Sequence, residues 1–243
     1  MPDDRFFVPE NFATKATTFL KDQELHHLLH VMRVRVGESI ELVNGKGQLA
    51  YGILEKIEKQ QAHIAIQKVV SEEPPSHTLI LAQGLPRLPR LEYILEKATE
   101  LGVTDIWLFP ADQSERKELT PTQLQRLQQI LISSIKQCGR LYLPKITLKP
   151  ALYGWQPLQD AFFGDTTPTA PPLIYAYQRQ ASSSIWIVGP EKGFTKEETS
   201  FLTTSLRAQG VSLHPNTLRV DTAAIAGLSL LSSLTLFPEP ANN

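Results

Sequence analysis

Two segments in the C-terminal half of the chain have the residue types and spacing of a ligand-binding site. The first, residues 185–195, reads as a buried strand, the turn Gly189-Pro-Glu-Lys-Gly193 and the start of a helix. The second, residues 218–224, reads as a loop that enters a final apolar helix. Strand-to-helix turns expose backbone N–H groups, and α/β folds bind ligands at such turns. We therefore expect a ligand site here, with an ordinary strand–helix connection as the alternative for the first turn.

Basic residues offer a second kind of chemistry, the binding of phosphate groups. Residues 136–149 include four basic residues and no acidic one. The planar guanidinium of arginine pairs with two phosphate oxygens at once, so arginines in loops beside a ligand site favour RNA binding. A solvated surface is the alternative. The residues that we expect to contact RNA are Arg33, Arg35, Arg87, Arg90, Lys136 and Arg140.

These segments belong to a larger ordered set of motifs. Upstream of them stand His26-His-Leu-Leu-His-Val-Met-Arg-Val-Arg-Val-Gly37, Lys97-Ala-Thr-Glu-Leu-Gly-Val103, Ser114-Glu-Arg116 and Gln137-Cys-Gly-Arg140. A short motif alone occurs often by chance, whereas the same motifs in one order do not. The set resembles the ribosomal RNA small subunit methyltransferase E family, which belongs to the SPOUT class of methyltransferases that use S-adenosylmethionine.

The resemblance implies a fold and an assembly. It implies a small PUA-like β-barrel that binds RNA in residues 1–70, a linker in 71–77 and a SPOUT methyltransferase domain in 78–243. The second domain should be α/β, with a mostly parallel sheet and a deep trefoil knot that follows from the resemblance alone. The class forms homodimers in which the partner completes each pocket, and the apolar helix at 223–236 is a plausible interface.

The resemblance also implies a reaction, the methylation of N3 of a uridine in small-subunit ribosomal RNA. Neutral uridine carries a proton on N3, so the enzyme must help to remove it or stabilise the anion, and an arginine beside O2 or O4 would do so electrostatically. The candidate catalytic residues are Arg116, Arg140 and Arg219, with Asp221 as a base or as the residue that holds an arginine. No metal is needed. A knotted protein that only binds ribosomal RNA, or a related enzyme that methylates another base or a ribose, are the alternatives.

In this class the loops after the last strands form the cofactor pocket, which here implies residues 175–179, 189–193 and 213–219. The candidate residues for binding S-adenosylmethionine are Tyr177, Gly189, Pro190, Glu191, Gly193, Leu213, Leu218 and Arg219.

Several positions depart from the family's pattern. Lys192 replaces the first of two paired glycines, His214-Pro215 stands where the family has glycine, and Asp221 replaces a glutamate. A lysine forced to positive φ is strained by ~1–2 kcal/mol. Alternatively the loop follows another path, which we favour because it leaves Lys192 unstrained. We expect His214 to be a surface residue.

Composition sets wider bounds. With 42% hydrophobic residues the chain of 243 residues can bury an ordinary core, and its formal net charge of −1 does not by itself indicate a nucleic-acid binder. The single cysteine, Cys138, excludes an intrachain disulfide and a multi-cysteine zinc site. The N-terminus does not resemble a signal peptide, and no apolar run approaches the ~20 residues that cross a bilayer. We therefore expect a cytoplasmic protein.

The hydrophobic pattern predicts the elements that position these residues. Residues 1–70 alternate like strands, with a hairpin turn at Asn44-Gly45 and one short helix within 22–30. Beyond the linker, strands alternate with helices, which indicates a largely parallel sheet covered on both faces. We expect strands at 78–83, 104–109, 171–177, 185–188 and 211–213, and helices at 91–101, 121–138, 195–208 and 222–236.

Local signals place the helix ends. Gly102 should end the first of these helices, and Thr120 with a following proline should begin the second. Thr195 and Glu198 have the spacing of a capping box, in which each side chain accepts a hydrogen bond from the other's backbone. Asp221 or Thr222 is the expected cap of the last helix. Cys138 lies on the apolar stripe of its helix and should be a buried thiol.

Overall fold

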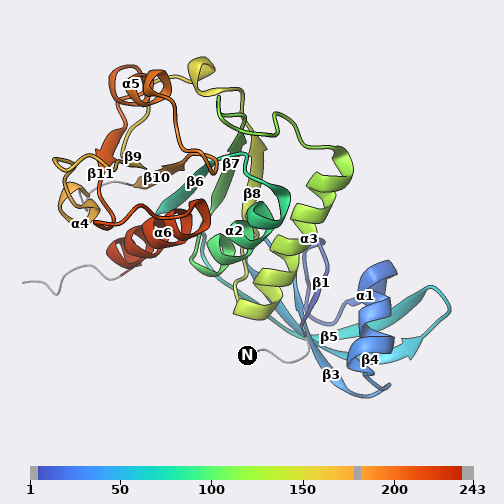
Figure 1. The fold of residues 1–243 in the computed structure, drawn as a ribbon. Coiled ribbons are helices and arrows are strands. Elements are labelled where there is room, and N and C mark those ends of the chain that lie inside the picture. Colours follow the sequence, from blue (N-terminus) through green and yellow to red (C-terminus); the bar gives the residue numbers. More distant parts are fainter. Residues whose placement is uncertain (1–4, 178–181, 237–243) are drawn as a thin grey trace, which may run out of the picture. The chain divides into compact units, whose positions relative to one another are not determined.

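The computed structural model describes residues 5–177 and 182–236. The chain divides into two compact units (Figure 1). The first contains the residues up to Pro74 together with Ile132–Leu143, and the second contains Pro75–Leu131 and the residues from Pro144 onward. The predicted boundary near residue 70 does not capture the segment Ile132–Leu143, which returns to the first unit.

The first unit is a five-stranded sheet with a short helix. Its strand order is β1 (Arg5–Phe7), β3 (Ser39–Val43), β4 (Gln48–Ile57), β5 (Gln61–Ser71) and β2 (Thr17–Lys21). The strands β3, β4 and β5 form an antiparallel meander. The predicted hairpin turn is confirmed, because the Asn44 side chain accepts hydrogen bonds from the backbone N–H groups of Lys46 and Gln48 at 2.8 and 3.1 Å. Gly45 and Gly47 supply the positive φ that the turn requires.

The predicted helix after β2 is confirmed as two joined pieces. The α-helix α1 (Asp22–His26) continues as a π-helix, η1 (His27–Met32). Leu25 and Leu28 from these pieces are buried in a core that includes Phe6, Ile40 and Ile64.

The second unit contains a six-stranded sheet in which every pairing is parallel, as predicted. Its strand order is β11 (Gln209–Val211), β9 (Ala161–Gly164), β10 (Ser183–Val188), β6 (Thr78–Gly84), β7 (Asp105–Phe109) and β8 (Lys145–Leu148). Parallel pairing aligns the carboxyl ends of the strands along one edge, and open α/β sheets bind ligands outside that edge.

Helices cover both faces of this sheet. On one face α6 (Val220–Leu236) packs on β6 and β10 and against α2 (Leu88–Glu100), and these two helices lie side by side in Figure 1. Alternation along β10 assigns the faces: Trp186 contacts α6, where its indole N–H donates to Ala223 O at 3.1 Å. Ile185 and Ile187 belong to the opposite cluster, with Leu202 of α5 (Lys196–Thr204).

Most helix ends are where the sequence predicts them. Gly102, at φ +91°, follows α2. In α3 (Pro121–Cys138), the backbone N–H of Gln123 donates to Thr120 Oγ1 at 3.3 Å, while the N–H of Thr120 donates to Gln123 Oε1 at 3.0 Å. The capping box of α5 is confirmed, because the Thr195 hydroxyl and the Glu198 carboxylate each accept a hydrogen bond from the other residue's N–H.

Several predictions about elements are wrong. The expected strand at 171–177 is instead the short helix α4 (Leu173–Ala176), because two consecutive prolines lack the N–H groups of a strand and Pro172, at φ −58°, already has helical φ. The sheet takes β9 instead, which the sequence did not indicate. Helix α6 begins at Val220, so Asp221 lies in its first turn and not at the cap position, although its Oδ1 accepts a hydrogen bond from the N–H of Thr222 at 3.0 Å. Cys138 is exposed, because it lies at the end of α3, beyond the buried stripe.

Within the described ranges, no helix is long and apolar enough to cross a membrane.

Candidate active site

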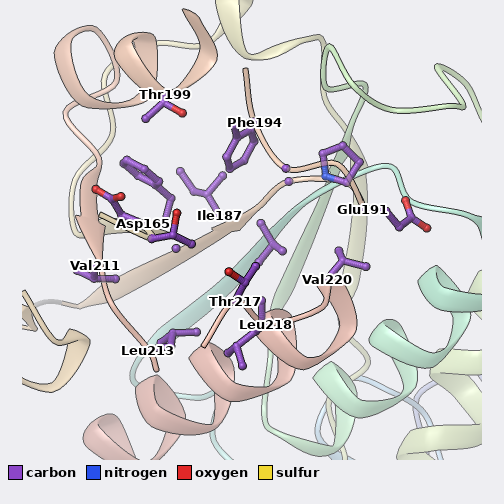
Figure 2. Close-up of a pocket in the computed structure, with 18 of the residues that line it drawn as sticks. Asp165, Ile187, Glu191, Phe194, Thr199, Val211, Leu213, Thr217, Leu218 and Val220 are labelled. Carbon is purple, nitrogen blue, oxygen red and sulfur yellow. The ribbon is translucent and has the colours of Figure 1, made fainter. Parts of the chain in front are cut away.

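A cavity of about 400 Å³ opens at the carboxyl ends of β9 and β10 (Figure 2). Three segments provide most of its lining, namely residues 163–166, residues 186–194 and the chain between β11 and α6, and individual residues of β11, α5 and α6 complete it. Two of these three walls are the ones expected from the sequence. The described residues of the remaining expected segment, 175–177, do not line the cavity, and its last two residues, 178–179, lie outside the described ranges.

The loop Gly189-Pro-Glu-Lys-Gly193 forms the first wall and folds tightly on itself. The N–H of Gly193 donates to Pro190 O at 2.9 Å, and Gly193 has a φ of +74°. A Cβ atom on Gly189 would lie 3.1 Å from the carbonyl carbon of Gly193, closer than most real Cβ contacts. Both glycines are therefore required, the first by proximity and the second by its backbone angle. Lys192 is exposed and is not at positive φ, so the structure shows no strain there.

A buried glutamine, which the sequence did not single out, holds the start of this loop. Gln83 is the last residue but one of β6, and its Nε2 donates to Gly189 O at 3.0 Å and to Gly84 O at 2.8 Å. Its side chain is fully buried, and its Oε1 has no hydrogen-bond partner within the described structure. Two carbonyl acceptors fix the orientation of the amide, because only the NH2 group can donate to them.

The second wall combines apolar and polar residues, since His214 and Asn216 also belong to it. Leu213, Thr217, Leu218 and Val220 lie along it, on the segment that enters α6 (Figure 2). The apolar members of this wall, together with Ile187 of β10, give the cavity apolar patches suited to a flat, partly hydrophobic ligand.

The third wall comes from the carboxyl end of β9. Phe163, Gly164, Asp165 and Thr166 line the cavity there. Tyr177, which was expected in this place, is instead buried with its ring centroid 6.3 Å from that of Phe162. The only sequence signal for this wall is the four-residue apolar strand itself.

A cluster of charged residues joins the N-terminal ends of α2 and α6 to the first wall. Glu191 Oε1 accepts a hydrogen bond from the backbone N–H of Arg87 at 3.0 Å and lies 3.5 Å from Arg90 Nε. Arg90 also lies 3.7 Å from Asp221 Oδ2. Of the two roles considered for Asp221, this geometry fits the one in which the carboxylate holds an arginine. Arg90 is in the first turn of α2 and not in a loop.

Arg87 and Arg116 lie on neighbouring loops of the same unit. The Arg87 guanidinium donates two hydrogen bonds to the Glu115 carboxylate, at 2.9 and 2.8 Å. These bonds raise the pKa of Arg87 and lower the pKa of Glu115. The positive charge of Lys192 also lowers the pKa of Glu115. Arg116 donates to Gln123 Oε1 at 3.2 Å. Both arginine side chains therefore already have a partner within the chain.

Arg219 lies between the cavity-lining residues Leu218 and Val220 and is exposed. Among the described residues, no ion pair or side-chain hydrogen bond is recorded for it. Arg219 itself does not line the cavity, so its exposed guanidinium is available only to a ligand that extends beyond the cavity rim. His214 is also exposed and lines the cavity, consistent with the expected surface position.

The other basic residues expected to bind RNA belong to the first unit. Arg33, at φ 56°, ends the π-helix, and both it and Arg35 are exposed. Lys136 is largely buried and pairs with Glu24 at 2.8 Å, so its charge is neutralised inside the unit and it is a poor phosphate ligand. Arg140 is half-buried, and this burial lowers its pKa.

Over residues 5–177 and 182–236, no group of three or more His, Cys, Asp or Glu side chains is placed to hold a metal ion.

Comparisons with known proteins identify the class to which this fold and site belong. Residues 72–232 match the family described as RNA methyltransferase domain, and residues 20–67 match the family described as RNA methyltransferase PUA domain. The chain therefore belongs to the RNA methyltransferase family, with a PUA-like first unit and an α/β second unit.

Its relatives include several proteins named ribosomal RNA small subunit methyltransferase E. The Synechocystis protein is 29% identical over 95% of this chain and 77% of its own length, and the Bacillus subtilis protein is 28% identical over 95% and 96%. A solved structure of this enzyme from Neisseria gonorrhoeae, bound to S-adenosyl methionine, superposes with a TM-score of 0.85 and 27% identity over 96% of this chain and 98% of that one. These similarities confirm the resemblance to the ribosomal RNA small subunit methyltransferase E family.

A protein from Legionella pneumophila, solved in complex with S-adenosylmethionine, has the same fold. Its TM-score is 0.86 at 25% identity, covering 95% of this chain and 97% of that chain.

Proposed function

We propose that this protein uses S-adenosylmethionine to methylate N3 of a uridine in small-subunit ribosomal RNA. Membership of the RNA methyltransferase family supports methyl transfer to RNA. The names of the relatives support ribosomal RNA of the small subunit as the substrate. The observation that carries the proposal is the cavity at the carboxyl ends of β9 and β10, which the glycine loop and the segment before α6 enclose.

The cavity suits S-adenosylmethionine in size and in chemistry. Its volume of about 400 Å³ lies within the usual range of small-molecule sites, and its mixture of apolar and polar lining residues suits an adenosine group. The residues that would hold the cofactor are Gly189, Pro190, Glu191, Gly193, Leu213, Leu218 and Arg219. Arg219 borders this set without lining the cavity itself, and Tyr177 is left out because its side chain is buried against Phe162. When bound, S-adenosylmethionine supplies an electrophilic methyl group on its sulfonium sulfur.

The protein's own task is to present a uridine whose N3 has lost its proton. We infer that Arg219 stabilises the N3 anion, because it is exposed between two residues that line the cavity and makes no ion pair or side-chain hydrogen bond within the described residues. Asp221 orients Arg90 at the same rim. Arg116 and Arg140 contribute to RNA binding. Correct placement of the base and the cofactor can lower the activation barrier by ~7–11 kcal/mol. The target base must be unpaired or turned out of its stack, because N3 lies on its pairing edge.

The class also implies a homodimer and a trefoil knot, which we propose for this chain. The apolar helix α6 contributes to the dimer interface, and sedimentation of the full chain measures the assembly.

One experiment tests the activity directly. The purified protein is titrated calorimetrically with S-adenosylmethionine and then incubated with small-subunit ribosomal RNA, whose modified nucleotides are mapped by mass spectrometry. The proposal requires both cofactor binding and a new N3-methyluridine. Cofactor binding with methylation at another position would support a different specificity. The absence of cofactor binding would leave a protein that only binds RNA.

Removal of the Arg87 side chain is expected to weaken RNA binding and to reduce its salt dependence. Each lost phosphate contact lowers the slope of log K against log salt by about 0.7–0.9. Glu115→Gln should have the opposite effect on affinity, because it frees the Arg87 guanidinium from its partner. Filter binding at several salt concentrations measures both, with Arg126→Ala as the control, since Arg126 is exposed and pairs with Glu92. If Arg87→Ala and Glu115→Gln keep the wild-type slope, as the control should, Arg87 does not contact phosphate.

Lys192→Gly is expected to leave the affinity for S-adenosylmethionine within about twofold of wild type. Lys192 is not at positive φ, so there is no strain of the left-handed kind to relieve. The same variant should weaken RNA binding modestly, since it removes an exposed positive charge beside Glu115. Calorimetry and filter binding on the one variant separate the two effects. A gain in cofactor affinity of fivefold or more would show that the lysine strains the loop.

A further inference from the structure

Glu198 is a buried carboxylate in the helix that follows the loop 189–193. It lies in the first turn of α5, and only 1% of its surface is exposed. Burial of a charged or polar group is costly unless hydrogen bonds compensate it. The partners of this carboxylate therefore show what keeps it in place.

Both oxygens of Glu198 accept hydrogen bonds from backbone N–H groups, and the two groups belong to different loops. Oε2 accepts from Thr195 at 2.9 Å, which is the bond expected of a capping box. Oε1 accepts from Asp112 at 2.8 Å. The helix does not need this second bond, because Asp112 follows β7 and lies outside α5.

The loop that contains Asp112, residues 110–117, is folded as one piece. The Lys117 ammonium donates to the carbonyl oxygens of Ala111 and Asp112, at 2.6 and 2.9 Å. Ser114 Oγ accepts from the N–H of Ala111 at 3.2 Å. Tyr153 anchors the loop further, with its hydroxyl donating to Asp112 Oδ2 at 2.9 Å. Because these bonds connect its residues, a shift of the Asp112 backbone moves the whole loop.

This loop has hydrogen bonds both to the helix beside the cavity and to a candidate RNA-binding arginine. It contributes no residue to the cavity lining, whereas Phe194 and Thr199, on either side of the capping box, both line the cavity. The same loop carries Arg116 and also Glu115, the carboxylate that holds Arg87. Glu198 is thus the hydrogen-bonded connection between residues that would touch the cofactor and residues that would touch RNA.

We propose that Glu198 is a positioning residue that couples occupation of the cofactor cavity to the order of the loop 110–117. The inference rests on the proposed function. A ligand in the cavity orders Phe194 and Thr195. The N–H of Thr195 then fixes the Glu198 carboxylate, and this carboxylate fixes the N–H of Asp112. Coupling between two sites is reciprocal, so RNA that orders this loop should tighten cofactor binding by the same factor.

The test compares Glu198→Gln with Glu197→Gln. The two variants lose the same charge from neighbouring positions in the first turn of α5, but Glu197 is exposed. A glutamine at 198 offers one carbonyl oxygen to two N–H donors and so leaves one of them unpaired. Amide hydrogen exchange is followed over residues 110–117 and 189–195, with and without S-adenosylmethionine, alongside calorimetry.

In the wild type and in Glu197→Gln, the cofactor should slow exchange across 110–117. In Glu198→Gln, exchange there should be about tenfold faster, unresponsive to the cofactor, and accompanied by about tenfold weaker cofactor binding. A residue that only caps α5 would change exchange at 189–195 and leave 110–117 as in wild type, which would overturn the proposal. If Glu198→Gln does not fold, Glu198→Asp is tested instead. It keeps a carboxylate on a shorter side chain and should give the same faster amide exchange at 110–117.

The outcome also separates this inference from the proposed function. If the wild type binds no S-adenosylmethionine, the proposed function fails. Faster exchange at 110–117 in the free Glu198→Gln variant, and not in Glu197→Gln, would still support the connection between the two loops. Equal exchange in the two free variants would reject it.

Discussion

Replacement of Gly227 by alanine is expected to lower the free energy of unfolding by about 3 kcal/mol, at the upper end of the usual cost of overpacking a core. Gly227 is buried in the middle of α6, where a Cβ atom would overlap the indole of Trp186. That indole is fully buried and anchored by its bond to Ala223 O, so it cannot move aside. The better helix propensity of alanine, ~1 kcal/mol, acts in the opposite direction and is too small to compensate.

Urea unfolding followed by circular dichroism measures this effect. Ser229→Ala, an exposed change in the same helix, is the matched control and should alter stability by less than about 0.5 kcal/mol. Trp186→Phe should recover part of the loss when it is combined with Gly227→Ala, because the smaller ring vacates the space that the new methyl group needs. A stabilised Gly227→Ala variant would contradict the packing of α6 on β10. Trp186 also lines the cavity, so Gly227→Ala, which displaces its indole, should bind S-adenosylmethionine more weakly.

Local patterns predicted the parts of the fold that depend on local energetics. The strands β6, β7 and β10 are apolar runs, α2 and α3 have apolar residues at helical spacing, and the capping box of α5 is encoded within four residues. Strand β9 was missed because four apolar residues do not distinguish a strand from a short buried loop. Its place in the sheet is set by pairing with β10 and β11, which are distant in sequence.

The candidate site divides in the same way. Glycines at 189 and 193 identified one wall because tight turns and close backbone approach need that residue type. The charged contacts around it could not be predicted, because they join residues far apart in the chain. Arg87 and Glu115 are 28 residues apart, and Glu198 lies 86 residues from Asp112. Gln83 carried no signal at all, since a glutamine at the end of a strand is ordinary until its two carbonyl partners are known.

Arg219→Ala is expected to reduce the rate of methyl transfer about 100-fold, the scale found when one preorganised group that stabilises developing charge is removed. Arg219 is exposed between two residues that line the cavity, at the beginning of α6. The N-terminal end of that helix adds a partial positive charge, which also favours an anion. Other nearby cations are already engaged, since Arg87 pairs with Glu115 and Arg90 lies near Glu191 and Asp221. The loss of Arg219 should therefore be compensated poorly.

The dependence of the rate on pH distinguishes this role from simple cofactor binding. If Arg219 stabilises the N3 anion, the rate of Arg219→Ala should rise more steeply with pH than that of wild type, because hydroxide then produces the anion that the arginine no longer favours. Single-turnover rates at saturating S-adenosylmethionine measure this, with the exposed Arg207→Ala on the same unit as the control. A variant with a higher KM for the cofactor, an unchanged maximal rate and a wild-type pH profile would show that Arg219 binds the cofactor and does not act on the base.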